Sequence, residues 1–133
     1  MKDGLTITHP ARLFRIQDAD GRGPYKPGFS KQWVDMEKDD RLCPPMFAEF
    51  PDWRKHFDRA AARGFVHFGC CMRGIQGFHR WFTPAEIERL SGFGYRLVDA
   101  SGLTVVCEGK AQVIGASRWP LKMLPVLEWE AVE

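Results

Sequence analysis

A short apolar run near the start of the chain holds an arginine, and a turn rich in glycine follows it. The run is Leu-Phe-Arg-Ile at residues 13–16, and the turn is Asp-Gly-Arg-Gly at residues 20–23. A guanidinium binds phosphate or carboxylate through two parallel N–H donors, so Arg15 is a candidate anion ligand, with Arg22 beside it. The turn can also bring backbone N–H groups close to a ligand. The alternative is a charge at a sheet edge, followed by an ordinary tight turn.

Two later segments carry the other candidate residues. His67 lies between Val66 and Phe68 in an apolar run that continues into Gly69. A histidine can act as a general base near neutral pH, although a histidine on an apolar strand is most often a core or edge residue. Gln112 is neutral and cannot be a base, but its amide can orient a ribose hydroxyl or a water by hydrogen bonding.

The four cysteines predict reduced, mostly buried thiols. Cys70 and Cys71 are adjacent, and neighbours on a strand point to opposite faces, which does not suit a disulfide framework. The cysteines and histidines also lack the paired spacing of zinc ligands, so we expect no metal. A nucleophilic role for Cys70 or Cys71 requires a base that lowers the pKa of the thiol.

The bulk composition favours one compact globular domain over residues 1–133. Hydrophobic residues make up 44% and charged residues 27%, which is ordinary for such a domain. With 19 basic and 17 acidic residues, the charge is too balanced to favour a nucleic acid as the partner. We find no pattern of a signal peptide or a membrane span, and therefore expect a cytoplasmic protein without membrane association. The oligomeric state is not predicted.

Periodicity and turn residues predict an α+β fold with a mainly antiparallel sheet and two short helices. A proline-rich, irregular arm is expected at about 24–51. One helix begins at Asp52 and ends near Gly64, and the other begins at the Thr-Pro-Ala-Glu sequence at residues 83–86, which has the pattern of a capping box. Residues 72–82 fit either a short helix or a turn. The expected strands cover residues 12–17, 65–71, 95–99, 103–107, 111–116 and a segment within 125–132.

The last strands are expected to form a meander, because the turns between residues 95 and 116 are short enough for antiparallel hairpins. If the strand that begins near Ala111 lies beside the strand of Arg15, and the His67 strand flanks them, then Arg15, His67 and Gln112 converge on one concave site. This arrangement requires Arg15 and Gln112 to lie on the same face of the sheet.

These segments together resemble the ADP-ribosyltransferase superfamily. Residues 13–16 look like that family's first strand, which holds NAD through an Arg or His, and residues 66–82 look like its strand-into-helix element. Residues 108–114 look like the strand with the catalytic glutamate, in whose place Gln112 stands. A glutamine keeps the hydrogen bonds of a glutamate but lacks the charge that stabilises an oxocarbenium-like centre. The chain is also similar to small bacterial or phage-encoded proteins.

The resemblance implies a small domain that binds NAD or a related nucleotide and acts at the nicotinamide glycosidic bond. Its catalytic residues would be Gln112 and His67, and its cofactor-binding residues would be Arg15, Arg22, Phe68 and Gly69. The alternative is a non-enzymatic interaction module, such as a phage-encoded inhibitor of a host protein. It becomes the leading interpretation if Arg15 and Gln112 lie on opposite faces of the sheet or far apart, because the nucleotide-binding interpretation then fails. The interaction module is favoured by five tryptophans spread along the chain, a residue type that dominates interface energies. Whether the protein is an enzyme stays open.

Overall fold

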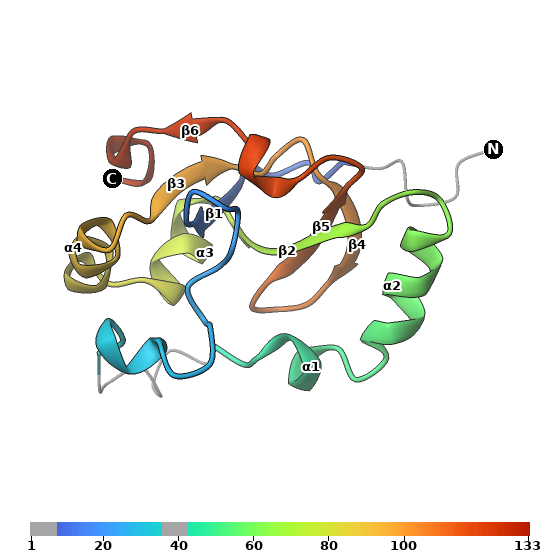
Figure 1. Ribbon diagram of the computed structural model, residues 1–133, viewed down its shortest axis with the longest axis horizontal. Coiled ribbons are helices and arrows are strands. Elements are labelled where there is room, and N and C mark those ends of the chain that lie inside the picture. Colours follow the sequence, from blue (N-terminus) through green and yellow to red (C-terminus); the bar gives the residue numbers. More distant parts are fainter. Residues whose placement is uncertain (1–7, 36–42) are drawn as a thin grey trace.

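The computed structural model shows a six-stranded antiparallel sheet with the strand order β4-β5-β2-β1-β3-β6 (Figure 1). It describes residues 8–35 and 43–133, so most of the first ten residues and the middle of the proline-rich arm lie outside the described residues. The expected α+β class is confirmed. The strands are β1 (Leu13–Gln17), β2 (His67–Arg73), β3 (Arg96–Asp99), β4 (Thr104–Glu108), β5 (Val113–Ser117) and β6 (Val126–Leu127).

Four α-helices occur in the described part of the chain, and two of them are the helices expected from the sequence, α2 and α4. Residues 72–82, for which a helix and a turn were both open, contain helix α3. Helix α3 packs against β1 and β2, and α2 packs against β4. The helices are α1 (Met46–Glu49), α2 (Trp53–Ala61), α3 (Gly74–Trp81) and α4 (Pro84–Gly92), with 3-10 turns η1 (Ser30–Gln32), η3 (Leu121–Met123) and η4 (Trp129–Val132).

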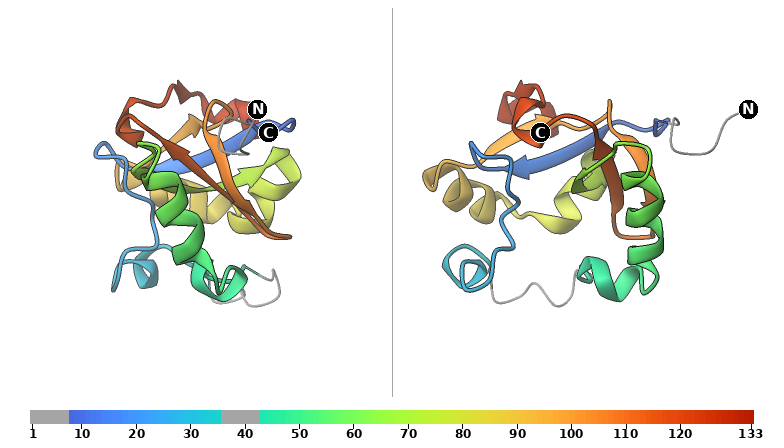
Figure 2. Two further views of the ribbon diagram at one scale, coloured as in Figure 1. Left: turned by 90° about the vertical axis from the view of Figure 1, so that its right-hand side faces the viewer. Right: turned by 45° about the vertical axis from the view of Figure 1, so that its right-hand side comes forward.

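The capping box at the start of α4 also ties the arm to the fold. The Thr83 hydroxyl accepts from the Glu86 N–H at 3.2 Å, and the Glu86 carboxylate accepts from the Thr83 N–H at 3.0 Å. The second carboxylate oxygen of Glu86 accepts from the N–H of Asp35 at 2.8 Å. The buried glutamate thus begins the helix and holds the first half of the arm under the sheet (Figure 2).

One predicted connection is wrong. The strands at residues 95–99 and 103–107 form no hairpin with each other, because β3 pairs with β1 and β6, whereas β4 pairs with β5 at the other side of the sheet. The short segment between them crosses a face of the sheet, where Leu103 packs on Gly115. A β-carbon on Gly115 would lie 2.8 Å from Leu103 Cβ. Buried Leu103 and the turn residues both hold the crossing segment, because Ser101 Oγ accepts from the Leu13 N–H at 3.0 Å and the Ala100 N–H donates to the Leu13 carbonyl at 2.9 Å.

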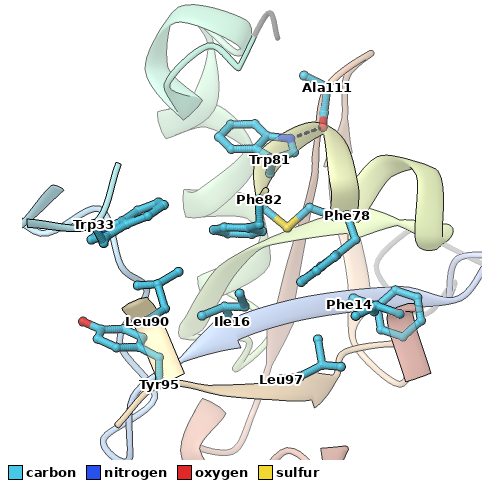
Figure 3. Close-up of a cluster of buried hydrophobic side chains, with 12 residues drawn as sticks. Phe14, Ile16, Trp33, Phe78, Trp81, Phe82, Leu90, Tyr95, Leu97 and Ala111 are labelled. Atoms are coloured by element: carbon cyan, nitrogen blue, oxygen red, sulfur yellow. Dashed lines mark hydrogen bonds between the residues drawn. The ribbon is translucent and has the colours of Figure 1, made fainter. Parts of the chain in front are cut away.

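The two faces of the sheet have separate cores. On one face, Phe14 and Ile16 pack with aromatic side chains from α3 and the arm (Figure 3). The Trp81 indole N–H donates to the carbonyl of Ala111 at 2.8 Å, which fixes α3 against the start of β5. On the other face, Leu13 belongs to a second cluster that includes Leu121 of η3. The strand that carries Arg15 is therefore covered on both faces.

Candidate functional site

The guanidinium of Arg15 lies where β1 and β2 part. Their ladder contains only two pairs, Leu13 with Arg73 and Phe14 with Met72. Beyond these pairs, Arg15 Nη1 donates to the carbonyl of Cys70 at 3.1 Å and takes the place of a strand-to-strand backbone bond. The side chain therefore bridges the two diverging strands.

Two further hydrogen bonds fix the orientation of this guanidinium. Arg15 Nε donates to Gln17 Oε1 at 2.9 Å, and Arg15 Nη2 donates to the carbonyl of Gly21 at 3.0 Å. Gln17 was not identified from the sequence, although its position two residues along the strand places it on the same face as Arg15. Three of the five N–H groups of Arg15 are thus used within the protein, and one remains on each of Nη1 and Nη2.

Arg15 is a buried charge whose acceptors are all neutral. The residue is 6% exposed, and none of the described residues places a carboxylate in ion-pair contact with it. Burying a charge is costly unless an opposite charge or several hydrogen bonds compensate it. Here the amide and carbonyl groups compensate the charge in part, and the positive potential remains available to an anion.

The glycine-rich turn after β1 lies beside Arg15, but its donors are occupied. Asp18 Oδ1 accepts from the N–H groups of Asp20 and Arg22, both at 2.9 Å, and the N–H of Gly21 donates to the Asp18 carbonyl at 3.0 Å. The expectation that the turn offers its N–H groups to a ligand is wrong for these three. The turn supplies the Gly21 carbonyl to Arg15 instead.

Asp18 also pairs with a cation at the edge of the site. Its second oxygen lies 2.8 Å from Lys26 Nζ. Burial alone would raise the pKa of Asp18. The hydrogen bonds from Lys26 and from two backbone N–H groups together lower it by more than burial raises it, so the net shift is downward. The carboxylate is therefore ionised at neutral pH and holds the turn in place.

A cavity of about 770 Å³ opens beside Arg15. Its wall is formed by β1 and the turn, by β2, by the end of α3, and by arm residues 24–26 and 43–47. The volume is in the range of small-ligand sites, roughly 300–1,000 Å³. Five aromatic side chains line the cavity, and two of them, Tyr25 at 44% and Phe47 at 65%, are exposed. The aromatic residues are Tyr25, Phe47, Phe68, Trp81 and Phe82.

The charges of this cavity are of one sign. Arg15, Arg22 and Lys26 line it, and no carboxylate side chain of the described residues does. Lys26 is already paired with Asp18, so Arg15 and Arg22 are the lining cations that have no carboxylate partner within the described part of the chain. An apolar and aromatic cavity with this charge suits an anion that has a planar, apolar part.

Gln112 lies in the wall of the same cavity and is 1% exposed. Its Nε2 donates to the carbonyl of Pro44 at 3.1 Å, which links the start of β5 to the second half of the arm. Arg22, Phe68 and Gly69 also line the cavity. Arg15, Gln112 and these three residues are thus brought together by the tertiary structure.

His67 lies outside this cavity. It borders a smaller hollow of about 420 Å³, together with Val66, Pro120 and Lys122. Alternation directs His67 away from the face of Phe68 and Gln112, and although His67 shares the face of Gly69 and Arg15, it lies at the start of β2 beside the smaller hollow. The expectation that His67 joins Arg15 and Gln112 in one site is therefore wrong.

Arg15 and Gln112 also leave the sheet on opposite faces, against the expectation of a shared face. Arg15 alternates with Phe14 and Ile16, which face α3, whereas Gln112 shares its face with Ile114 and so with Cys70 and Ile16. The strand order differs too, because β2 lies between β1 and β5. The shared face on which the nucleotide-binding interpretation depended is therefore absent. Both side chains nevertheless line the same cavity, because the Arg15 guanidinium occupies the place where β1 and β2 part.

All four cysteines are free thiols. Two of them, Cys43 and Cys70, line the cavity with half-buried side chains. Burial raises the pKa of Cys70, and it raises the pKa of Cys71 to about 12, although the nearby Arg15 charge acts in the opposite direction. A thiol that stays protonated is a poor nucleophile. The raised pKa values therefore do not favour a nucleophilic role for Cys70 or Cys71.

Residues 8–35 and 43–133 contain no cluster of three His, Cys, Asp or Glu side chains that could hold a metal ion. Within the same residues, no helix has the length and apolar character that crossing a membrane requires.

Comparison with models of protein families, with curated proteins and with solved structures gave no match to this chain.

Proposed function

We propose that the protein is a binding domain for NAD or a related nucleotide, held in the cavity beside Arg15. The observation that carries this proposal is the Arg15 guanidinium, which is buried, lacks a carboxylate partner among the described residues and lies in the wall of an aromatic cavity. One N–H remains on each terminal nitrogen, and two such donors match the oxygens of a phosphate.

The remaining wall supports a nucleotide over a simple anion. Aromatic side chains such as Phe68 and Trp81 provide apolar surface for a base, and Arg22 adds a second positive charge at the turn. Base–aromatic contacts and cationic contacts to phosphate are the usual components of nucleotide affinity.

The bond-breaking step that the resemblance to ADP-ribosyltransferases implies is not part of the proposal. The residues of the cavity fit the phosphates of NAD, but no carboxylate among the described residues lines it to stabilise a positive charge on the nicotinamide ribose. His67 lies in a different hollow. We therefore propose binding and derive no transfer step.

The test is isothermal titration calorimetry with adenosine monophosphate, NAD and adenosine. We expect adenosine monophosphate to bind roughly tenfold more tightly than adenosine, because only the phosphate contacts the guanidinium. Arg15→Met should remove this difference and Arg22→Gln should reduce it. Arg96→Gln, which removes an exposed arginine outside the cavity, should leave it unchanged.

No binding of adenosine monophosphate or NAD at millimolar concentration would overturn the proposal, as would equal affinity for adenosine and its monophosphate. Circular dichroism of each variant checks that it is folded. If Arg15→Met does not fold, the affinities of the unchanged protein and of Arg22→Gln for adenosine monophosphate and for adenosine still test the proposal.

A second candidate function, binding to another protein, is favoured by an exposed apolar group near η3. Trp119 is 69% exposed and Met123 is 67% exposed. Val66 is also exposed, and the pairing of its neighbour His67 with Ser117 brings it to the same end of the sheet as Trp119. A second copy of the chain is the first partner to test, by sedimentation velocity of the protein and of Trp119→Ser over a range of concentrations. A monomer at all concentrations would contradict self-association.

A further inference from the structure

Two glutamines are buried near the cavity, and they differ in how their amides are used. Gln17 is satisfied at both ends, because Oε1 accepts from Arg15 Nε and Nε2 donates to the carbonyl of Leu121 at 2.7 Å. Gln112 uses only one end, the bond from Nε2 to the carbonyl of Pro44. Among the described residues, no donor is bonded to Gln112 Oε1.

The orientation of the Gln112 amide follows from its partner. A carbonyl oxygen only accepts hydrogen bonds, so the Pro44 carbonyl requires the nitrogen of the amide, and the oxygen is directed elsewhere. Gln112 lines the cavity and is 1% exposed, and its Oε1 lacks a protein donor without being fully covered by protein atoms, so this acceptor is open to the cavity. Water can donate to it in the free protein, whereas a ligand that displaces the water must bring a donor of its own to avoid leaving the acceptor unpaired.

The cavity therefore has complementary polar groups in different parts of its wall. Arg15 has donors left on two nitrogens, and Gln112 has an acceptor. The surfaces between them are largely aromatic or apolar, including Phe68, Met72 and Trp81. A matching ligand has an anionic group, an apolar planar ring and an N–H donor on that ring.

We propose that the cavity selects nucleotides whose base carries an exocyclic amino group, through acceptance of that N–H by Gln112 Oε1. This inference rests on the proposed function and specifies its ligand class. Adenine and cytosine carry such an amino group, whereas hypoxanthine and uracil carry a carbonyl oxygen at the corresponding position. That carbonyl would place an acceptor against an acceptor, and the amide cannot turn over without losing its bond to Pro44.

The first experiment uses the unchanged protein and two matched pairs of ligands in calorimetry. Adenosine monophosphate is compared with inosine monophosphate, and cytidine monophosphate with uridine monophosphate. We expect the amino-bearing member of each pair to bind roughly tenfold more tightly, which is the effect of one hydrogen bond to an acceptor that the bound ligand covers. N6,N6-dimethyladenosine monophosphate, which has no N–H on that nitrogen, should bind as weakly as the inosine compound.

The second experiment assigns the selectivity to its residue. Gln112→Met keeps the length of the side chain and removes the acceptor, so the ratio of affinities for adenosine and inosine monophosphates should fall to about one. Gln76→Met makes the same change at an exposed position of α3, outside the cavity, and should leave the ratio at its original value. Thermal unfolding of both variants checks that they are folded.

The outcomes separate this inference from the proposed function. If both members of each pair bind with equal affinity and Arg15→Met weakens both, the binding function stands and the base selectivity is wrong. If the selectivity survives in Gln112→Met, the binding function stands and the assignment of the selectivity to Gln112 is wrong. If none of the monophosphates binds, both the proposed function and the selectivity are overturned.

Discussion

The guanidinium of Arg15 lies directly over the α-carbon of Gly69 on the neighbouring strand. A β-carbon at Gly69 would lie 3.0 Å from Arg15 Cζ and 2.9 Å from Leu121 Cδ1. Both distances are shorter than ordinary van der Waals contacts. The absence of a side chain at residue 69 therefore allows the arginine to reach the Cys70 carbonyl and the cavity from the opposite face of the sheet.

Gly69→Ala should displace this guanidinium. Because the methyl group meets Arg15 and Leu121 in a packed region, we expect a loss of about 1–3 kcal/mol in the free energy of unfolding and weaker binding of phosphate-bearing ligands. Gly102→Ala is the control, since a β-carbon there meets no atom within 4 Å. It should change stability by less than about 0.5 kcal/mol. Urea unfolding measures both, and a Gly69→Ala protein of unchanged stability would contradict the packing argument.

Asp18 should matter more as a hydrogen-bond acceptor than as a charge. Asp18→Ala removes the acceptor of two backbone N–H groups and should cost about 1–2 kcal/mol of stability. Asp18→Asn keeps an acceptor oxygen and loses only the ion pair with Lys26, so its cost at neutral pH should be smaller.

The pH dependence separates the two roles of Asp18. Since its pKa is lowered in the folded protein, its charge stabilises the fold above its ordinary pKa of 3.8, and this contribution is lost as the pH falls further. The unfolding free energy of Asp18→Asn should therefore approach that of the unchanged protein in acid. A difference between the two that stays constant from pH 7 to pH 3 would refute this role.

Cys71 should make the protein less stable in alkali. Burial raises the pKa of this thiol from 9.0 to about 12. Below pH 9 both states keep the proton, so the contribution is constant. Between pH 9 and pH 12 the unfolded state loses a proton that the folded state retains, and stability falls by up to about 1.4 kcal/mol per pH unit. Urea unfolding of Cys71→Ala from pH 8 to pH 10 should show a shallower fall, and an identical slope would exclude the thiol as the cause.

Glu49 and Gly109 should be energetically coupled. Glu49 Oε2 accepts from the N–H of Ala111 at 2.9 Å, and a β-carbon on Gly109 would lie 2.0 Å from the same oxygen. Gly109→Ala should therefore expel the carboxylate and cost about 1–3 kcal/mol. In a Glu49→Ala background the same substitution should cost much less. A double-mutant cycle measures the coupling, and additive effects would contradict the contact.

Local sequence signals determined several of the helices and strands. The capping box at residues 83–86 began α4 as expected, because a threonine and a glutamate three residues apart bond each other's backbone N–H groups without help from distant residues. Helix α2 and strand β1 were likewise readable from spacing and flanking residues. The local signal misled at residues 100–102. They have the composition of a hairpin turn, but they carry the chain across the sheet from β3 to β4.

The sequence by itself determined the class of fold, most of the elements and the residue types that form the cavity. Only the tertiary structure decided which of them meet. Arg15 and Gln112 reach one cavity because β1 and β2 part after two pairs, whereas His67 lies at the start of β2 and borders a separate hollow. Strand order and splay depend on contacts between distant residues, such as Leu103 on Gly115, and these contacts leave no periodic signal in the sequence.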